Sequence, residues 1–440
     1  MRENRRSSAV ARVLAASWAF LVCGLVTTQT CGGEFAIAPV APSMDRWVYP
    51  FGDFLGDRSV APNFASFDPR FDTRDAQYLM GWNTDALVVT NAGPTRYLLR
   101  RARLEVRNSV ANAFVYDATF DPYLTYATNQ TGYVPDADPG RPVELYGAGF
   151  RNGFTAATFL ENSPYGRINP ITSGNISIGT RNAFAAMFGD QGQLVDVSNN
   201  VGQSNPEWTQ PPFEVRPWAV GTTTNAAPGE LVPEDALFTF DLDLKDPQIV
   251  GYLQSALNEG RLRLVLASLS PANQVTPGGT GGGGAGAYPQ WATRENLLFD
   301  PPKLILEGVV VGTEDTDQDG LPDDWERFYF GSLVKSAADD TDQDRSTELA
   351  EYQAGTDPTS PGSYLRIDTL KLDGDRNATL GFPTTPSRSY RVEASHDLQS
   401  WWPAQGTLMF PTPGRALFTE QRLTDPPVPP AQSNYRVVAE

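Results

Sequence analysis

Two groups of acidic residues have the type and spacing needed to hold a divalent cation. The first group spans twelve residues, with oxygen-bearing side chains at its first, third, fifth, ninth and twelfth positions. The candidate ligands, which include a backbone carbonyl at position seven, are Asp315, Asp317, Asp319, Leu321, Asp323 and Glu326. This is the spacing of an EF-hand-type calcium loop, in which position nine acts directly or through water and the last glutamate is bidentate. Gly320, at position six, permits the left-handed turn that such a loop requires.

A second, imperfect copy of this loop begins at residue 340. Its candidate ligands are Asp340, Asp342, Asp344, Ser346, Glu348 and Glu351. Arg345 stands where the first copy has glycine, and a β-carbon in the left-handed conformation costs about 1–2 kcal/mol. We therefore expect Ca²⁺ at both loops, with the weaker site at the second. The alternative is an acidic linker with solvated carboxylates, but the repeated spacing argues against it.

The charge distribution also favours bound cations. The 440-residue chain has a formal net charge of −18, and more than half of it lies in 312–360, where fourteen residues are acidic and three are basic. Such a segment should stay disordered unless cations neutralise it. An acidic surface repels nucleic acid and anionic lipid, so we expect neither as a partner.

The N-terminus has the organisation of an export signal. Several arginines precede an apolar stretch from Val13 to Val26, which is too short to span a membrane comfortably. We expect a signal peptide over 1–33, with cleavage between Thr28 and Ala38, and a secreted or cell-surface protein. No later segment is apolar enough to cross a bilayer, so no transmembrane segment is expected.

The positions of the two cysteines determine whether the exported chain can contain a disulfide. Cys23 lies inside the predicted signal, and Cys31 lies near the predicted cleavage point. The mature chain therefore has no internal disulfide and must depend on core packing and metal. Two alternatives for export are lipid attachment at Cys31 and twin-arginine export through Arg5-Arg6.

Alternating apolar and polar residues predict a mainly β fold in several parts. We expect a large jelly-roll-like sandwich over 45–311, a short helical calcium-binding spacer over 312–360, and a small immunoglobulin- or fibronectin-like sandwich over 361–440. Half-buried strands are expected at 98–106, 238–244, 262–266 and 304–311 in the large domain. In the small domain they are expected at 365–372, 378–382, 389–394, 416–420 and 434–438.

Two further segments interrupt the strands of the large domain. Asp246 is a favourable N-cap, Pro247 suits the first helical position, and Gly260 ends an apolar face, so a helix is expected between them. The glycine-rich tract at 277–287 is expected to be a loop, with a substrate-gating lid as the alternative.

Three parts of the chain contain segments that resemble known families. DTDQDGLPDDWE and DTDQDRSTELAEYQAGTDP resemble bacterial thrombospondin type 3 calcium repeats, apart from Arg345. This resemblance implies a stiff, calcium-loaded spacer between modules. FPTTPSRSYRVEASHDLQSWWPA and NYRVV resemble a fibronectin-like C-terminal module, for which surface attachment or sorting is plausible. FDTRDAQYLMGWNT, YLLRRARLEV, DPQIVGYLQSALNEGRLRLVLASL and PPKLILE resemble strands and a helix of DNRLRE-type carbohydrate-binding jelly rolls.

Candidates for catalysis are few. The single histidine, His396, lies in the small domain, and the chain has neither HExxH nor GxSxG. Carboxylate pairs at Asp72/Asp75 and Asp136/Asp138 could in principle cleave glycosides, but acids beside proline and glycine are usually turn formers. The Asp136/Asp138 loop could instead hold another calcium ion.

These observations favour a non-enzymatic extracellular protein that binds a glycan or a cell-surface component. Aromatic side chains in or near predicted loops could stack on sugars, although core packing is their commoner fate. They are Trp47, Tyr49, Trp82, Tyr123, Tyr126, Trp208, Trp218 and Trp291. The alternatives are a carboxylate-based polysaccharide-cleaving enzyme in 45–311 and a purely structural stalk or coat component.

Overall fold

The computed structural model describes most of the chain after the predicted signal. The described residues are 32–50, 58–66, 72–126, 131–166, 181–189, 193–201, 212–272, 287–372, 378–412, 414–420 and 434–439. The predicted signal up to residue 31, the glycine-rich tract up to residue 286, and Trp208 lie outside them. Strands account for 37% of the chain and helices for 11%, which confirms the mainly β fold. Among the described residues, each helix is too short or too polar to span a bilayer.

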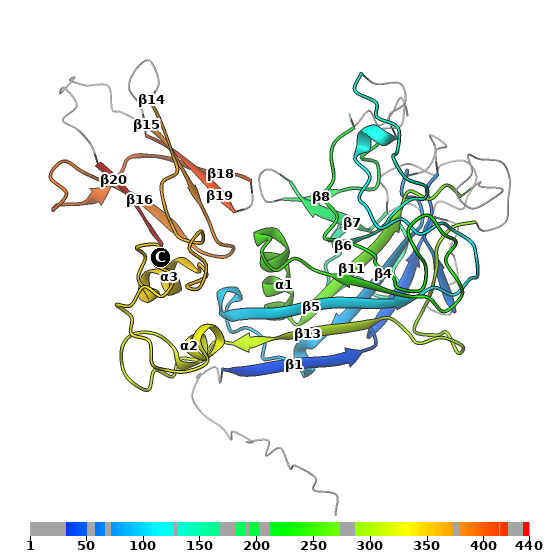
Figure 1. Ribbon diagram of the computed structural model, residues 1–440, viewed down its shortest axis with the longest axis horizontal. Coiled ribbons are helices and arrows are strands. Elements are labelled where there is room, and N and C mark those ends of the chain that lie inside the picture. Colours follow the sequence, from blue (N-terminus) through cyan, green and yellow to red (C-terminus); the bar gives the residue numbers. More distant parts are fainter. Residues whose placement is uncertain are drawn as a thin grey trace, which may run out of the picture.

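The large domain contains two main antiparallel sheets (Figure 1). The four-stranded sheet has the order β1 (Gly33–Val40), β13 (Lys303–Val310), β5 (Tyr97–Arg107) and β10 (Leu237–Asp241). The seven-stranded sheet has the order β2 (Met44–Val48), β4 (Gln77–Asn83), β11 (Arg261–Ser268), β6 (Val143–Phe150), β7 (Ala183–Phe188) and β8 (Leu194–Asp196), and β9 (Ala219–Val220) pairs with β6. A small sheet pairs β3 (Val60–Pro62) with β12 (Gln290–Ala292). Three 3₁₀ turns are η1 (Thr84–Ala86), η2 (Pro94–Arg96) and η3 (Tyr123–Thr125).

The alternation in β5 places its apolar side chains in the core. Ala102, Leu104 and Val106 are buried, while Arg103 and Glu105 between them are half-buried. Leu104 lies opposite Phe240 of β10 on one side and Leu304 of β13 on the other. Apolar side chains from neighbouring strands therefore lie side by side, which stabilises the register.

Strand β1 extends the large domain toward the N-terminus. It pairs with β13 from Gly33 opposite Val310 onward, so the sheet begins before residue 45, where the sequence had placed the domain boundary. Its exposed and buried positions alternate over a short stretch only, because β1 lies at a sheet edge. Cleavage of the predicted signal near Ala38 would delete about half of β1. The pairing of β1 therefore favours a cleavage site closer to Thr28.

The seven-stranded sheet is covered on both faces. One cluster of buried residues, including Trp82, Leu264 and Trp291, fills the space between the two main sheets. A second cluster, including Leu79, Tyr146 and Val265, packs on the opposite face, beneath Phe159. Strands β4, β6 and β11 are therefore buried at nearly every position, so the strand expected to be half-buried at 262–266 is buried on both faces.

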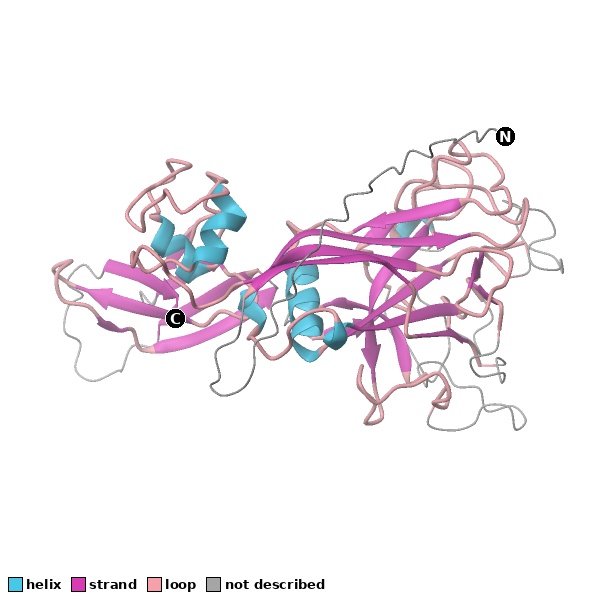
Figure 2. Cartoon of the chain, turned by 90° about the horizontal axis from the view of Figure 1, so that it is seen from below, coloured by secondary structure: helices cyan, strands magenta, loops and turns pink. Residues whose placement is uncertain are grey.

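Helix α1 (Pro247–Glu259) forms where the sequence placed it. The side chain of Asp246 accepts a hydrogen bond from Gln248, and Gly260 ends the helix with a φ of 72°. Ile249, Leu253 and Leu257 are buried against the large domain. Figure 2 shows α1 between the large domain and the C-terminal module.

The spacer contributes helices α2 (Asp323–Phe330) and α3 (Glu348–Ala354). Both helices end at a glycine with a φ of 72°, at Gly331 and Gly355. Trp325 of α2 is buried against Val309 and Val311 at the end of β13, so the spacer packs directly on the four-stranded sheet.

The C-terminal module is a small sandwich of two sheets. One sheet has the order β14 (Thr369–Leu372), β15 (Ala378–Pro383), β19 (Arg415–Glu420) and β18 (Gly406–Thr412). The other has the order β17 (Trp402–Pro403), β16 (Tyr390–Ser395) and β20 (Asn434–Ala439). The sequence predicted five of these strands but not β17, which is only two residues long, or β18, which follows it.

The module contacts both α1 and α3 through the turn that precedes β16. A β-carbon on Gly251 of α1 would lie 2.8 Å from Pro386, so this helical position has no room for a side chain. Arg388 donates a hydrogen bond of 2.9 Å to the carbonyl of Tyr352 in α3. Glycine inside a helix costs about 0.5–1 kcal/mol relative to alanine, and here the close contact with Pro386 accounts for it.

Candidate metal centre

The first loop brings its three leading aspartates together. One carboxylate oxygen each of Asp315, Asp317 and Asp319 lies within 4.8 Å of the others. Asp315 accepts hydrogen bonds from the amides of Asp319 (3.2 Å) and Gly320 (3.0 Å), which bend the loop around it. Gly320 has a φ of 98°, so the left-handed turn expected at position six is confirmed. Three carboxylates this close repel one another, and a bound cation would compensate this repulsion.

Glu326, in the first turn of α2, is close enough to these aspartates to feel their charge. Its side chain is 0% exposed, and neither carboxylate oxygen has a hydrogen-bond partner among the described residues. Burial, together with repulsion from Asp317 and Asp319, raises its pKa to about 7. A buried carboxylate with two unpartnered oxygens is costly on its own, and a bidentate cation would satisfy both oxygens.

Asp323 has a different role from the other predicted ligands. Its oxygens accept hydrogen bonds of 2.7 Å from the amide and from the hydroxyl of Thr316, and one of 2.9 Å from Arg327. The hydroxyl bond from Thr316 is the largest influence lowering its pKa. Asp323 therefore fastens the start of the loop to α2, and ligation by it, direct or through water, stays a prediction. The side chain of Leu321 is buried beneath the loop.

The second loop repeats this geometry. One carboxylate oxygen each of Asp340, Asp342 and Asp344 lies within 4.8 Å of the others. Asp340 accepts hydrogen bonds from the amides of Asp344 (3.1 Å) and Arg345 (2.9 Å). Arg345 has a φ of 80°, so this side chain does adopt the left-handed conformation that favours glycine. One oxygen each of Asp342 and Asp344 is buried without a hydrogen-bond partner among the described residues.

The carboxylates of the two glutamates in the second loop accept hydrogen bonds, unlike that of Glu326. Glu348 accepts bonds from the amide (2.9 Å) and hydroxyl (2.5 Å) of Thr341, as Asp323 does from Thr316. Glu351 is 0% exposed and accepts a bond of 3.2 Å from the Thr356 hydroxyl through Oε1, which leaves Oε2 unpartnered among the described residues. Burial and repulsion from Asp342 and Asp344 raise its pKa to about 8. Ser346 donates its amide to Asp344 at 2.8 Å.

The loops share one small core. Leu321, Trp325, Leu349 and Tyr352 belong to the same apolar cluster. A methyl of Leu349 would lie 3.8 Å from a β-carbon on Gly320, so the second loop's helix covers the first loop. Ordering one loop therefore helps to order the other.

Sequence reasoning missed two recurring features of these loops. Gln318 and Gln343, at position four, have φ values of 63° and 65°. Thr316 and Thr341, at position two, bind the acidic residue at position nine. The signal was present, because both copies begin with the identical run DTDQD.

In both carboxylate pairs considered for catalysis, at least one member lies beside an arginine. Asp72 lies 2.6 Å from the buried Arg181, and Asp75 lies 4.0 Å from the same guanidinium. Asp136 forms an ion pair with Arg141. A buried arginine–carboxylate pair is a structural contact, so Asp72 and Asp75 offer no support for glycoside cleavage.

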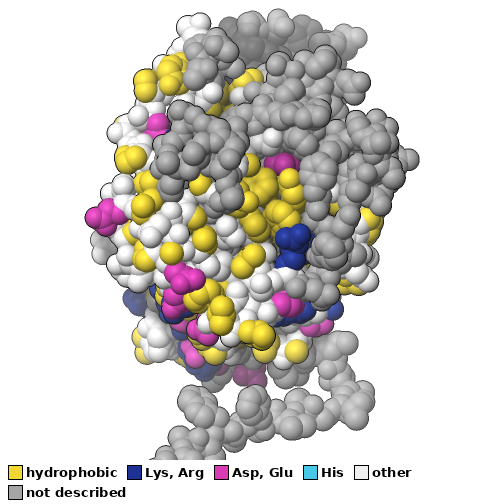
Figure 3. Space-filling view, turned by 90° about the vertical axis from the view of Figure 1, so that its right-hand side faces the viewer, with side chains coloured by type: hydrophobic (Ala, Val, Ile, Leu, Met, Phe, Trp, Pro, Cys, Tyr) yellow, Lys and Arg dark blue, Asp and Glu magenta, His cyan; other side chains and the backbone are white. Residues whose placement is uncertain are grey.

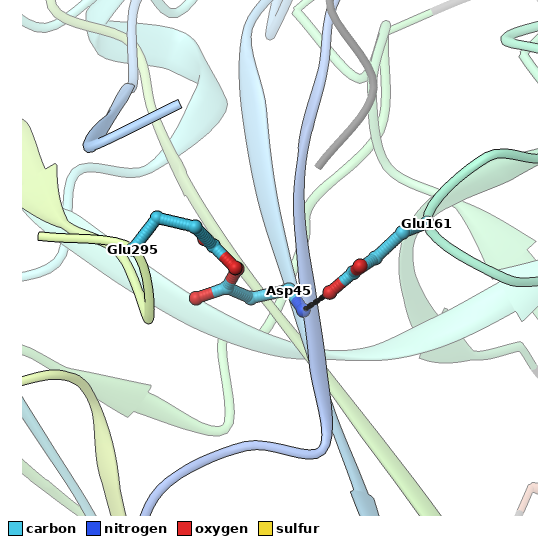
Figure 4. A group of neighbouring side chains, drawn as sticks. All are labelled: Asp45, Glu161 and Glu295. Atoms are coloured by element: carbon cyan, nitrogen blue, oxygen red, sulfur yellow. Dashed lines mark hydrogen bonds between the residues drawn. The ribbon is translucent and has the colours of Figure 1, made fainter. Parts of the chain in front are cut away.

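A third acidic group, Asp45, Glu161 and Glu295, lies in the large domain (Figure 4). Arg294 binds both glutamates, at 2.9 Å and 2.8 Å. Asp45 accepts bonds of 2.7 Å from the Tyr78 hydroxyl and from the Arg294 amide, and burial raises its pKa to about 7. These partners within the chain account for the group, so it makes a weaker case for a metal than the loops do.

The aromatic candidates for sugar binding mostly lie in the core. Trp82, Trp218 and Trp291 are buried, and Trp47 donates a hydrogen bond to the Pro62 carbonyl at 2.8 Å. Tyr126 packs against Arg141. Apolar side chains at the end of the large domain opposite the C-terminal module are interspersed with separate charged groups (Figure 3).

The chain matches no known family, no curated protein and no solved structure. The geometry of the two loops is therefore the main support for a functional site.

Proposed function

We propose that this chain is a secreted, calcium-binding multidomain protein in which two Ca²⁺ ions fix the C-terminal module to the large domain. The observation that carries the proposal is Glu326, a fully buried carboxylate with two unpartnered oxygens beside three clustered aspartates. The oxygen-only donor set of the loop suits a hard cation such as calcium.

Contacts of the spacer support its role as a junction. On the side of the large domain, Asp324 accepts a hydrogen bond of 2.8 Å from Gly312, and Arg100 stacks on Phe328 at 4.7 Å. On the other side, α3 accepts the hydrogen bond from Arg388 of the C-terminal module. Calcium that orders α2 and α3 would therefore set the spacing of the two sandwiches.

Calcium counting tests this proposal. Isothermal titration of the secreted, chelator-treated chain should show two more bound ions than the double variant Glu326→Gln/Glu351→Gln. The matched control is Glu314→Gln/Glu259→Gln, at two exposed acids outside every candidate metal-binding group, and it should lose none. Equal stoichiometry in the wild type and the loop variant would contradict the proposal.

A cleft at the junction favours a second role, the non-enzymatic binding of an extracellular glycan or cell-surface component. It has a volume of about 610 Å³ and is lined by all three parts of the chain, including Phe328, Tyr329 and Tyr364. Gln254, at its wall, donates to the Tyr97 carbonyl at 2.9 Å, and its Oε1 is buried without a partner among the described residues. Aromatic faces combined with a few polar groups are typical of ligand sites between domains.

A glycan array probed with the full chain tests this second role. Binding should require calcium and should fall in Tyr364→Ala, but not in Tyr133→Ala, where the tyrosine is exposed and not among the cleft residues. Cleavage of a polysaccharide would favour the enzyme alternative. Calcium-dependent self-assembly without glycan binding would favour a stalk or coat component.

A further inference from the structure

Unpartnered carboxylate oxygens mark the two calcium loops, and the same feature occurs once more at a distance from them. Among the described residues, Asp75 beside Arg181 aside, buried carboxylate oxygens without a hydrogen bond occur on six residues, and five of these belong to the two loops. Those five are Glu326, Asp342, Asp344, Glu348 and Glu351. Arg181 lies 4.0 Å from Asp75 and can balance its charge. The unpartnered oxygen of Asp117 is therefore the feature that remains to be explained.

Asp117 belongs to a cluster formed by two loops of the large domain. One carboxylate oxygen each of Asp117, Asp136 and Asp138 lies within 4.8 Å of the others. Asp117 is 4% exposed; its Oδ1 accepts hydrogen bonds from the amide (2.8 Å) and hydroxyl (2.9 Å) of Thr119, while its buried Oδ2 accepts none. The Thr119 hydroxyl also reaches Asp138 at 3.1 Å, which holds the two loops together.

The charges around this cluster do not balance. Asp121 is also close, and burial, with added repulsion from Asp117 and Asp136, raises its pKa to about 6. The nearby cation is Arg141, which contacts Asp136 and Asp121 but has no contact with Asp117 or Asp138. Four carboxylates therefore share one guanidinium, and a divalent cation would remove most of the excess negative charge.

We infer that Asp117, Asp136 and Asp138 form a further calcium site, in the large domain and independent of the two loops of the spacer. Carboxylate oxygens from a D-x-D turn and from a second loop are ligands that Ca²⁺ accepts in irregular geometry, with water at the remaining positions. Asp117 precedes η3 in the sequence, and the cyan segment that contains η3 lies away from α2 and α3 (Figure 1). The ion would clamp the loop 131–142, which leads into β6, to the segment around Asp117.

The experiment counts calcium and measures stability in the full secreted chain. The wild type should bind three ions and Asp117→Asn two, while Glu326→Gln/Glu351→Gln should keep one. The melting temperature of Asp117→Asn should exceed that of the wild type in chelator, because a buried charge is removed, and fall below it in calcium, because a ligand is lost. Asp121→Asn is the matched control, with all three ions retained.

Each outcome decides one question. Two ions in both the wild type and Asp117→Asn would overturn the further site while leaving the spacer sites intact. One ion in both the wild type and the loop variant, lost in Asp117→Asn, would support the further site and contradict the spacer. Loss of an ion in Asp121→Asn as well would show a diffuse acidic attraction and overturn the assignment to these three residues. A lower melting temperature of Asp117→Asn in chelator would identify Asp117 as a fold-stabilising residue instead of a ligand.

Discussion

The two loops of the spacer share the same first turn, and positions six and twelve distinguish how each could hold a cation. At position six, Gly320 of the first loop and Arg345 of the second both have positive φ, at 98° and 80°. At position twelve, Glu326 has two unpartnered oxygens, whereas Glu351 already accepts a hydrogen bond from Thr356. The duplicated loop therefore keeps its shape even where the sequence opposes it.

The shape of each loop and its affinity for calcium depend on different groups. The amides of positions five and six bind the first aspartate in both copies, so the turn forms with or without glycine. Backbone strain and a nearby positive charge should then weaken the second site, where Glu351 would also offer a cation fewer free oxygens. We expect the first loop to hold calcium more tightly.

Removing calcium affects both loops and should have the largest effect. A ligand present at one hundred times its Kd stabilises the folded state by about 2.7 kcal/mol for each site. The wild type should therefore melt at a clearly lower temperature in chelator than in saturating calcium, as measured by calorimetry. Glu326→Gln/Glu351→Gln should show a much smaller shift, and an unchanged wild-type melting temperature would contradict the spacer sites.

The final glutamates provide the sharpest contrast between the loops. Glu326→Gln removes a charged ligand with two free oxygens, so the affinity of the first site should fall at least tenfold, which is about 1.4 kcal/mol. Glu351→Gln should weaken the second site by a smaller factor. Titration calorimetry of the two variants would measure both losses, and equal losses would show that the contact with Thr356 has no effect on binding.

Acidification should also distinguish the loops. The pKa of each ion-free glutamate is raised above that of the unfolded chain, to about 7 for Glu326 and about 8 for Glu351. In chelator, the protonated forms favour folding, and this contribution is lost as pH rises from about 4.5 through these values. In calcium the direction reverses, because the ion must displace the protons.

Calcium affinity should therefore fall as pH is lowered from 8 to 5, and it should begin to fall at a higher pH for the second loop. Calcium titrations of the two single-loop variants over this range would measure both profiles. Identical profiles would contradict a difference between the two glutamates.

Replacing Arg345 by glycine should have the smallest effect. The variant relieves about 1–2 kcal/mol of left-handed strain and removes a cation, but it adds up to about 1 kcal/mol of backbone entropy cost. The second site should bind calcium a few-fold more tightly, measured in the Glu326→Gln background. The reciprocal variant Gly320→Arg should weaken the first site, and no change in either variant would make position six irrelevant to affinity.

The elements with strong local signals were predictable from the sequence. The N-cap Asp246 and the C-terminal Gly260 bound α1 as expected, and the alternation around Leu104 places β5 correctly. The aspartates of both loops lie together because their spacing is set within one short turn. Local chemistry determined these features, so one sequence was enough to find them.

Features that depend on contacts between distant segments were not predictable. Asp117 joins Asp136 and Asp138 only through packing of two separate loops, and no spacing rule connects them. Trp82 and Trp291 lie in the core because sheets on either side enclose them, whereas the sequence placed them only in or near predicted loops. The hydrogen bond from Thr356 to Glu351 likewise depends on the path of the chain after α3.

The start of β1 lies beside the spacer, and this determines how the molecule would be presented on a surface. A β-carbon on Gly32 would lie 2.1 Å from a carboxylate oxygen of Asp324 and 2.2 Å from the amide of Gly312, so the incoming chain passes against α2 with no room for a side chain. An anchor attached just before this point would hold the junction close to its support. The opposite loops of the large domain would then face outward, toward whatever approaches from solution.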